Sequence, residues 1–354
     1  MRVLRAVHGL VGLATIALVA GCHKEVEDVP LLTRTIGISD RFYDVQALDA
    51  EKAIVVGYSG KILLTTDGGF TWSQPASGVN RALYRVRFVD PENGWISGQE
   101  GLILHTTDGG KTWQRQKTDT PVYLFSLSFI DRNHGCAIGD KSILLQTTDG
   151  GANWSLHKIT TAAQKAESAE EAIASADPVL YDVQFVDANT GWVVGEFGKI
   201  YHTSDGGQTW TEQQLSLIGA EVVDALDLPT FFGVRFSDAQ HGVAAGLDGK
   251  IARTSDAGAS WKFDKMKLEY PIVDPLYNPA LFSDGTGWAT GAAGEVVHLD
   301  TPGGEWERAT LGMEVITWLR GMYWLDRDNG WIVGGLGLIL HTKDGGKTWI
   351  PSLG

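Results

Sequence analysis

Short runs of alternating apolar and polar residues, punctuated by glycine, asparagine and aspartate, recur along the chain from about residue 41 onward. One unit reads LYRVRFVD, then NGWISGQ, then GLILHTTDGGKTWQRQ. The runs are short and rich in β-branched and aromatic residues, and no helical periodicity competes with them. The unit therefore predicts four consecutive strands, here called A to D, at Tyr84–Val89, Trp95–Gly98, Leu102–Thr106 and Thr112–Arg115.

A phrase that ends in tryptophan closes each unit. Its clear copies are Thr65–Trp72 (TTDGGFTW), Thr106–Trp113 (TTDGGKTW), Thr147–Trp154 (TTDGGANW), Thr203–Trp210 (TSDGGQTW), Thr254–Trp261 (TSDAGASW) and Thr342–Trp349 (TKDGGKTW). A degraded seventh copy is Leu299–Trp306 (LDTPGGEW). The closing tryptophans are 41 to 56 residues apart, a period typical of closed arrays of four-stranded units. We predict an all-β fold, a single seven-bladed β-propeller over residues 41–354.

The residues of the phrase suit a structural role. Its aspartates can accept hydrogen bonds from backbone N–H groups of their own turn, and its glycines adopt positive φ without steric cost. These turn aspartates are Asp67, Asp108, Asp149, Asp205, Asp256 and Asp344. Of 13 tryptophans, seven end the phrase and four follow a glycine on strand B, and this regularity indicates packing.

The phrase S/T-x-D-G-G-x-T-W is the Asp-box, or BNR repeat. Together with G-W-x-x-G segments at Gly94–Gly98, Gly191–Gly195 and Gly330–Gly334, it resembles the Ycf48/Hcf136 family over roughly residues 41–354. The resemblance implies a seven-bladed propeller that assists photosystem II assembly. Sialidases, some glycosidases and sortilin-like receptors share the Asp-box, so the box alone indicates a fold and no activity.

The N-terminus has the pattern of a secretory signal that ends in a lipobox. Arg2 and Arg5 precede a short apolar run, and residues 18–22 read LVAGC. We expect residues 1–22 to be a lipoprotein signal peptide, Cys22 to carry the lipid, and residues 23–40 to be a flexible tether. The expected location is extracytoplasmic and membrane-anchored. His23 after the cysteine favours the outer membrane on the periplasmic side, or the thylakoid lumen in a photosynthetic source.

Charge and composition limit the classes of ligand and partner that we expect. The formal net charge of −14 disfavours nucleic acid as a partner. The nine histidines show no paired spacing and no phosphate loop is present, so we expect neither a metal nor a cofactor. Cys136, the only other cysteine, stands where four units have tryptophan, and we interpret it as a small buried apolar residue. We expect a monomer.

The D–A connections are the most variable parts of the units. Three are long, at about residues 155–179, 211–230 and 262–278, and propeller topology places them on the face of the B–C turns, opposite the Asp-boxes. Ala162–Ala176 predicts a helix, and Leu215–Leu226 a second short one. How the ring closes is left open, and one option is that Arg34–Ser39 pairs with blade seven.

Strand A, the innermost, shows three columns when the units are aligned on Asp90. The column at the entrance of the strand reads Tyr43, Tyr84, Phe125, Tyr181, Phe232, Asn278 and Arg320. The next reads Asp44, Arg85, Ser126, Asp182, Gly233, Pro279 and Gly321, and the third reads Gln46, Arg87, Ser128, Gln184, Arg235, Leu281 and Tyr323. The two polar columns predict a wet channel lined by arginines. The entrance column predicts either packing between blades or an apolar rim around the channel mouth.

From these columns we select candidates for partner binding. They are Arg85, Arg87, Arg235, Arg320, Tyr84, Phe125, Tyr181 and Phe232. Aromatic side chains and arginine contribute most of the binding energy at many protein interfaces. The resemblance to the Ycf48 family implies an assembly-factor role, so the predicted function is a non-catalytic, lipid-anchored extracytoplasmic scaffold that binds a membrane protein complex or its assembly intermediate and assists its assembly or operation. The complex is either photosystem II-like or an envelope transport or export complex.

An enzyme is the alternative function. The F/Y-R-I-P motif usual in sialidases is absent. A glycoside hydrolase needs only two carboxylates at a set separation, and Glu100, Asp140, Glu196 and Asp248 all stand on expected B–C turns. An Asp-box glycoside hydrolase or a carbohydrate-binding propeller therefore stays open as the second hypothesis.

Overall fold

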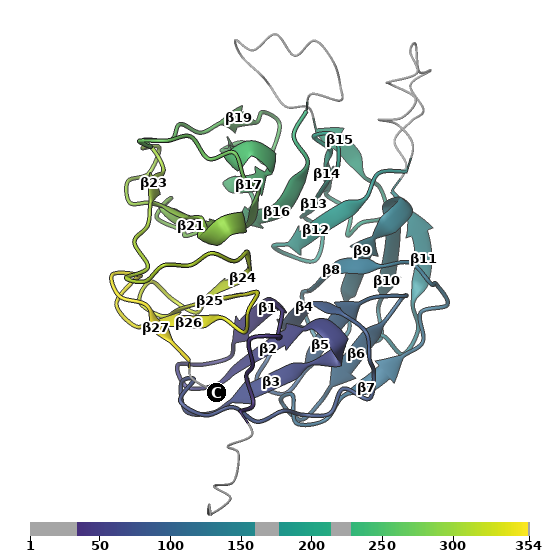
Figure 1. Cartoon of the computed structure of the whole chain (residues 1–354). Helices are drawn as coiled ribbons and strands as arrows, with labels where there is room; N and C mark the ends of the chain where they lie inside the picture. The colour runs from purple at the N-terminus through teal and green to yellow at the C-terminus, as the bar shows by residue number, and fades with distance from the viewer. Residues whose placement is uncertain (1–33, 160–176, 214–227, 353–354) are drawn as a thin grey trace, which may run out of the picture. The chain divides into compact units, whose positions relative to one another are not determined.

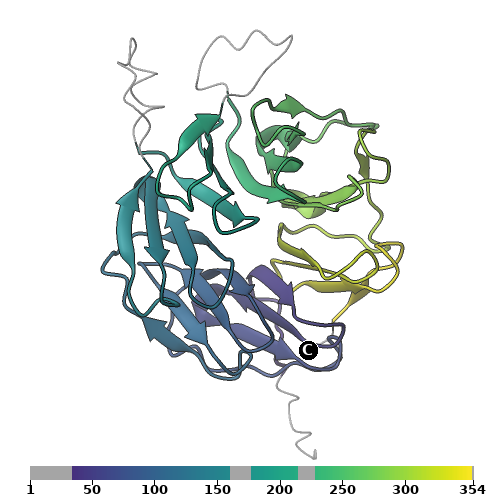
Figure 2. The same ribbon diagram turned by 180° about the vertical axis from the view of Figure 1, so that it is seen from behind.

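The computed structural model describes residues 34–159, 177–213 and 228–352. These residues form seven antiparallel sheets arranged as blades around a ring, seen from one side in Figure 1 and from behind in Figure 2. The prediction of an all-β, seven-bladed propeller is confirmed. In the described part of the chain, no helix has the length and apolar character needed to cross a membrane. Cys22, most of the predicted tether and both predicted helices lie outside the described residues.

Each sheet runs in chain order from strand A at the centre to strand D at the periphery. Blade one consists of β1 (Phe42–Ala47), β2 (Ala53–Gly57) and β3 (Ile62–Thr65), and a bridge between Leu64 and Ser73 stands in place of its fourth strand. Blade two is β4 (Leu83–Phe88), β5 (Gly94–Gly98), β6 (Ile103–Thr106) and β7 (Gln114–Gln116). Blade three is β8 (Leu124–Phe129), β9 (Gly135–Gly139), β10 (Ile143–Thr147) and β11 (Ser155–Lys158). Blade four is β12 (Leu180–Phe185), β13 (Gly191–Gly195), β14 (Ile200–Thr203) and β15 (Thr211–Gln213).

The remaining blades repeat this plan. Blade five is β16 (Phe231–Phe236), β17 (Gly242–Gly246), β18 (Ile251–Thr254) and β19 (Lys262–Phe263). Blade six is β20 (Leu276–Leu281), β21 (Gly287–Gly291), β22 (Val296–Leu299) and β23 (Glu307–Arg308), and blade seven is β24 (Leu319–Trp324), β25 (Gly330–Gly334), β26 (Ile339–Thr342) and β27 (Ile350–Pro351). Single 3-10 turns form four B–C turns, namely η1 (Tyr58–Gly60), η2 (Asp140–Ser142), η4 (Leu247–Gly249) and η5 (Ala292–Gly294). In blade two the predicted strands lie within two residues of the observed ones.

The Asp-box is a closed network of local hydrogen bonds. In blade one the Thr65 hydroxyl donates to Asp67 at 2.8 Å and accepts from the Gly69 N–H at 3.0 Å. The Asp67 carboxylate also accepts from the Thr71 N–H at 2.9 Å and from the Thr71 hydroxyl. The hydrogen bonds from Thr71, followed by that from Thr65, lower the pKa of Asp67 to about 2. These hydrogen bonds make the box a closed turn, in which Asp149 and Asp256 are exposed and the other box aspartates are partly buried.

Hydrogen bonds also sort the loops between the two faces of the ring. The Gly109 N–H of an Asp-box donates to the Glu92 carbonyl of the neighbouring A–B turn. On the opposite face, the Gly101 N–H of a B–C turn donates to the Val122 carbonyl of the D–A connection. Gly101 has a φ of +68°, and a Cβ on it would lie only 1.8 Å from the Thr120 carbonyl oxygen, so this turn requires glycine. The predicted division of the loops is confirmed.

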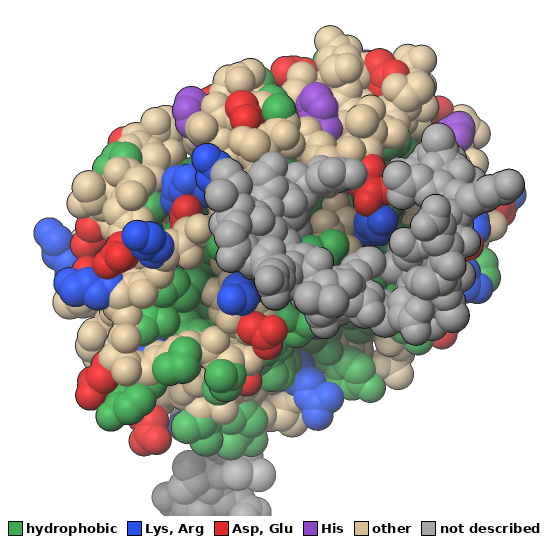
Figure 3. Space-filling model, turned by 90° about the horizontal axis from the view of Figure 1, so that it is seen from above, with side chains coloured by type: hydrophobic (Ala, Val, Ile, Leu, Met, Phe, Trp, Pro, Cys, Tyr) green, Lys and Arg blue, Asp and Glu red, His purple; other side chains and the backbone are tan. Residues whose placement is uncertain are grey.

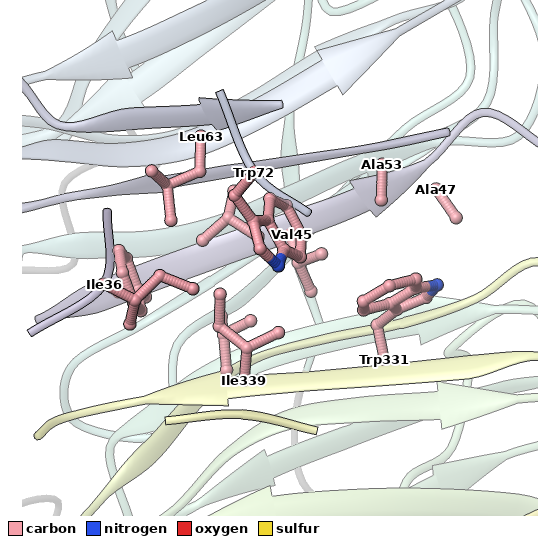
Figure 4. Close-up of a cluster of buried hydrophobic side chains, with 11 residues drawn as sticks. Ile36, Val45, Ala47, Ala53, Leu63, Trp72, Trp331 and Ile339 are labelled. Carbon is pink, nitrogen blue, oxygen red and sulfur yellow. The ribbon is translucent and has the colours of Figure 1, made fainter. Parts of the chain in front are cut away.

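The ring closes by packing of the last blade on the first. Strand β1 lies against β24, and the purple first blade and yellow last blade are neighbours in Figure 1. Figure 4 shows the core of this junction, where Trp331 and Ile339 of blade seven meet Val45 and Trp72 of blade one. The segment Arg34–Ser39 forms no strand, but Ile36 is buried in the same core. The ends therefore meet without a blade shared between them.

Candidate partner-binding site

Every innermost strand has a β-bulge at the same place. In blade two the pairing with β5 skips from Leu83 to Arg85, so that Tyr84 has no partner, and the other six blades skip the corresponding residue. A bulge redirects the side chain of its extra residue. Leu83 consequently packs in the core between blades, while Tyr84 is turned toward the channel mouth.

The seven bulged residues form one continuous rim around that mouth. They are Tyr43, Tyr84, Phe125, Tyr181, Phe232, Tyr277 and Arg320. Consecutive aromatic rings have centroids 5.0 to 5.5 Å apart, the range of favourable aromatic contact. The Arg320 guanidinium closes the circle, because it lies 5.1 Å from the centroid of the Tyr277 ring and 5.9 Å from that of Tyr43. This contact is a cation–π interaction on both sides.

The sequence alignment of blade six was wrong by one residue. It used the aspartate of the A–B turn as its reference, and in blade six this aspartate, Asp284, stands one position later than Asp90 does. The rim position therefore belongs to Tyr277 instead of Asn278, and the residues below it are Asn278 and Ala280 instead of Pro279 and Leu281. The dipeptide Leu276–Tyr277, which matches Leu83–Tyr84, would have identified the correct register.

Below the rim, polar side chains of one blade satisfy the exposed inner edge of the next. Asp44 accepts a hydrogen bond from the Val86 N–H at 3.0 Å, and the Gln46 amide bonds both the N–H and the carbonyl of Phe88. Asp182 and Gln184 make the same contacts between blades four and five. An unpaired strand edge needs such partners because buried backbone groups are costly to leave unbonded.

The inner strand edge of blade six needs no side-chain acceptor from blade five. Its inner strand has Pro279 where the other edges have an N–H, and the facing residue of blade five is Gly233. Proline has no N–H to satisfy. A Cβ on Gly233 would lie 2.5 Å from the ring of Pro279, so the glycine provides the space for this ring.

Three of the four candidate arginines belong to an internal ion-pair network. Arg85 is buried and reaches Asp182 at 2.6 Å and Asp44 at 3.7 Å. Arg87 pairs with Asp44 at 2.8 Å and Arg235 pairs with Asp182 at 2.6 Å. Burial alone would raise the pKa of Asp182, but the nearby Arg235 and Arg85 outweigh this effect and lower the pKa to about 2. These arginines hold blades together across the centre of the ring.

The channel mouth is nearly closed. The space enclosed by the rim and Arg85 measures about 30 Å³, which is room for about one water molecule. The aromatic rings of the rim therefore close most of the channel mouth, and the wet channel stays a prediction. Burial raises the pKa of Tyr84 to about 12, so its hydroxyl is neutral at physiological pH.

A groove of about 510 Å³ lies beside the rim over blades seven and one. Its walls include Tyr43 and Arg320 of the rim, Trp318, whose ring stacks on Tyr43 at 5.5 Å, and the exposed side chains of Ile38 and Leu336. Arg41 also lines it, and neither Arg41 nor Arg320 forms an ion pair with any described residue. The sequence did not single out Arg41, Ile38 or Trp318, because they lie outside the aligned columns.

Exposed apolar side chains gather on this same face. Of the 12 large hydrophobic residues exposed in the described chain, nine belong to B–C turns, D–A connections or the segment before blade one. These nine are Ile38, Tyr58, Tyr123, Leu247, Tyr270, Val273, Met313, Ile316 and Leu336. Concentrated apolar exposure marks an interaction surface. Figure 3, which shows the molecule from above relative to Figure 1, has basic and acidic side chains interspersed over the side that it presents.

The four carboxylates considered for glycoside hydrolysis stand on the B–C turns of four different blades, as predicted. Glu100 pairs with Arg81 at 2.6 Å, and Glu196 accepts a hydrogen bond from the Val179 N–H at 2.9 Å. Burial raises the pKa of Asp140 above its usual value. Among the described residues, no group of three His, Cys, Asp or Glu side chains is arranged to hold a metal ion.

Comparison with known proteins places the chain in a family. The family model described as "Photosynthesis system II assembly factor YCF48" matches residues 25–122, 113–170, 162–226 and 221–316. The photosystem II assembly protein Ycf48 of Synechococcus sp. (strain JA-3-3Ab) is 27% identical over 186 residues, in a match that covers 49% of this chain and 48% of the relative. The photosystem II assembly lipoprotein Ycf48 of Synechococcus sp. (strain CC9902) is 25% identical over 206 residues, in a match that covers 48% of this chain and 60% of the relative.

Comparison with solved structures also finds a Ycf48 protein. A solved structure described as "YCF48 bound to D1 peptide" covers 87% of this chain and 93% of its own, with a TM-score of 0.66 and 20% identity. At this identity the likeness concerns the fold alone, and the chain spans about half the length of the curated relatives that it matches. Because the family model covers most of the chain, the protein belongs to the Ycf48 family of Asp-box propellers.

Proposed function

We propose that this protein is a non-catalytic assembly factor that holds a segment of a membrane protein on the rim face of its propeller. The observation that carries the proposal is the closed circle of six aromatic rings and Arg320 at the centre of the face with most exposed apolar side chains. Aromatic rings and arginine are the side chains most enriched at interface hot spots. Family membership supports an assembly role, and a relative described as bound to a D1 peptide supports a polypeptide as the ligand.

The chemistry of the groove specifies the segment. Ile38, Trp318 and Leu336 provide apolar walls, while Arg41 and Arg320 provide two cations. An extended segment with apolar side chains and a carboxylate, either acidic or C-terminal, complements this surface. The client is a membrane protein complex or its assembly intermediate, with photosystem II as the first candidate because of the family and an envelope complex as the second.

The membrane attachment belongs to the same proposal. Cys22 would carry the lipid and keep the propeller at the extracytoplasmic membrane surface, in the outer membrane or, in a photosynthetic source, facing the thylakoid lumen. The lipobox in the sequence supports this, as does a relative described as a lipoprotein. A scaffold held at a membrane meets membrane-bound clients at a raised effective concentration.

The test is capture of the native client by the detergent-extracted protein. Arg320→Gln removes the cation between Tyr277 and Tyr43, and Trp318→Ala removes the wall that stacks on Tyr43. Each change should reduce client capture at least about tenfold, which corresponds to about 1.4 kcal/mol. Arg81→Gln, on the same face but outside the groove, and Lys111→Gln, on the Asp-box face, are the controls, and both should leave capture unchanged.

Two outcomes would contradict the proposal. If both groove variants capture the client as well as the wild type, while Lys111→Gln abolishes capture, the partner binds the Asp-box face. If purified protein instead cleaves a glycan and Glu100→Gln stops the cleavage, the scaffold proposal is wrong.

A further inference from the structure

Four blades have a tryptophan as the second residue of strand B, and its indole fills a slot between that blade and the next. They are Trp95, Trp192, Trp288 and Trp331. In blade two, the Trp95 ring stacks on His105 at 4.6 Å and on Phe129 of blade three at 3.7 Å between centroids. Its N–H donates to the Gly150 carbonyl of the next Asp-box at 3.0 Å. Trp192 makes the corresponding contacts with its own histidine and with blade five.

Blade three has Cys136 where these blades have tryptophan. The three groups that would surround an indole there are Gln146, Phe185 and Gly206, which correspond to His105, Phe129 and Gly150 in the contacts of Trp95. All four residues line one pocket of about 440 Å³ between blades three and four. The volume lies within the usual range for small-molecule sites.

The side chains around Cys136 replace the hydrogen bond of the missing indole but not its volume. The Gln146 amide donates to the Gly206 carbonyl at 3.0 Å, as the Trp95 N–H does to Gly150. Phe185 keeps the edge contact from its own Asp-box tryptophan, Trp210, at 6.0 Å. Among the described residues, however, no ring stacks on the face of Phe185 as Trp95 stacks on Phe129 in the junction before it.

The other two junctions without a strand-B tryptophan are filled. In blade one the position is taken by Ile54, which packs with Leu64 and Phe88. In blade five it is taken by Val243, which packs in one core with Trp306. The junction of blades three and four thus combines a small side chain with a neighbouring aromatic face.

We propose that this pocket binds an aromatic ring that carries a hydrogen-bond-donating or cationic group, in the slot that an indole occupies in the other blades. Phe185 offers a face for stacking. The group attached to the ring would point to the mouth of the pocket, which is lined by Asp131, Asp149 and Asn153. The site lies on the Asp-box face and is independent of the rim.

The charge of Asp131 and Asp149 at the mouth of the pocket determines which group on the aromatic ring would bind there. The side-chain hydrogen bond from Asn153 is the largest effect that lowers the pKa of Asp149. Desolvation raises the pKa of Asp131, but hydrogen bonds from His134 and Asn133 outweigh it and lower the pKa. Both carboxylates are therefore ionised at neutral pH. They favour an ammonium or amide N–H over a carboxylate.

Titration with matched probes tests the proposal. Calorimetry with tryptamine should show binding at least about tenfold tighter than with indole-3-acetate, which has the same ring and the opposite charge. A capped tripeptide with a central tryptophan distinguishes the source of the ring. Binding of this peptide identifies the anchor of a partner polypeptide, whereas binding of tryptamine alone identifies a free aromatic amine.

Variants that refill the slot provide the control on location. Cys136→Trp restores the tryptophan of blade two, and Cys136→Trp combined with Gln146→His restores the tryptophan and histidine pair. Both variants fill the slot, so both should weaken probe binding at least about tenfold and raise the melting temperature. Ile54→Val at the equivalent position of blade one should leave probe binding unchanged, and because it removes a buried methyl group it should lower the melting temperature slightly. If the refilled variants do not fold, tryptamine should still shift the NMR signals of the Gln146 side-chain amide in the wild type and leave those of Gln116 in place. Absence of binding by all probes, or undiminished binding by a folded refilled variant, overturns the proposal.

Discussion

Replacing Asp182 by asparagine tests whether the ion pairs at the centre of the ring hold the blades together. Asp182 has no exposed surface and accepts four hydrogen bonds: from Arg85 at 2.6 Å, Arg235 at 2.6 Å, Ser126 at 2.7 Å and the Val234 N–H at 3.0 Å. Asparagine keeps the shape but removes the charge that faces two guanidinium groups. It also turns an N–H group toward donors.

The expected loss of stability follows from two independent arguments. Removing one partner from a buried ion pair costs about 3–5 kcal/mol. A carboxylate whose pKa falls to about 2 in the folded state contributes about 2–3 kcal/mol at neutral pH. We therefore expect Asp182→Asn to lower the free energy of unfolding by about 3 kcal/mol or more at pH 7, measured by urea denaturation.

The pH dependence has a definite sign. Because the pKa of Asp182 is lowered by folding, its stabilisation is complete above the unfolded value near 4 and is lost as the pH falls from about 4 to 2. The difference between wild type and variant should shrink over that interval. Asp187→Asn, in an exposed turn of the same blade, is the control and should cost about 1 kcal/mol or less. A loss below 1 kcal/mol for Asp182→Asn, or a difference that persists at pH 2, would refute the reasoning.

Three further predictions concern other parts of the chain. Trp113→Ala should lower the free energy of unfolding by about 3–5 kcal/mol through the cavity it leaves against Phe88, while Asp108→Ala, in a partly exposed turn, should cost about 1 kcal/mol, both by denaturant titration. Burial, followed by the charge of the neighbouring Lys343, lowers the pKa of His341 to about 4, so the contribution of neutral His341 to folding stability is complete above about pH 6.5 and is lost as the pH falls toward 4. His341→Gln should therefore make the melting temperature depend less on pH between about 6.5 and 4. An unchanged pH dependence would contradict the argument. Cys22→Ser should release a folded, soluble protein and abolish labelling by a fatty-acid analogue, and retained label would place the lipid elsewhere.

The sequence by itself determined the number of blades and the chemistry of their turns. Each Asp-box is complete within eight residues, and its contacts, such as Thr65 with Asp67, are local. Local hydrogen bonds and strand alternation require particular residue types at regular positions in the sequence. A single unit such as residues 84–115 was therefore enough to predict the strands of blade two within two residues. The sorting of loops to the two faces followed from the same order of strands.

Only the tertiary structure decided which polar side chains face a partner and which face each other. Arg85 and Asp182 are 97 residues apart, and nothing local indicates that they pair across the ring. Likewise, the β-bulge that turns Tyr277 into the rim depends on pairing with the next strand, so an alignment on one turn aspartate missed it. The pocket beside Cys136 also depends on Phe185 of the following blade. Contacts between blades join residues distant in sequence, and such contacts exist only once the blades have packed against one another.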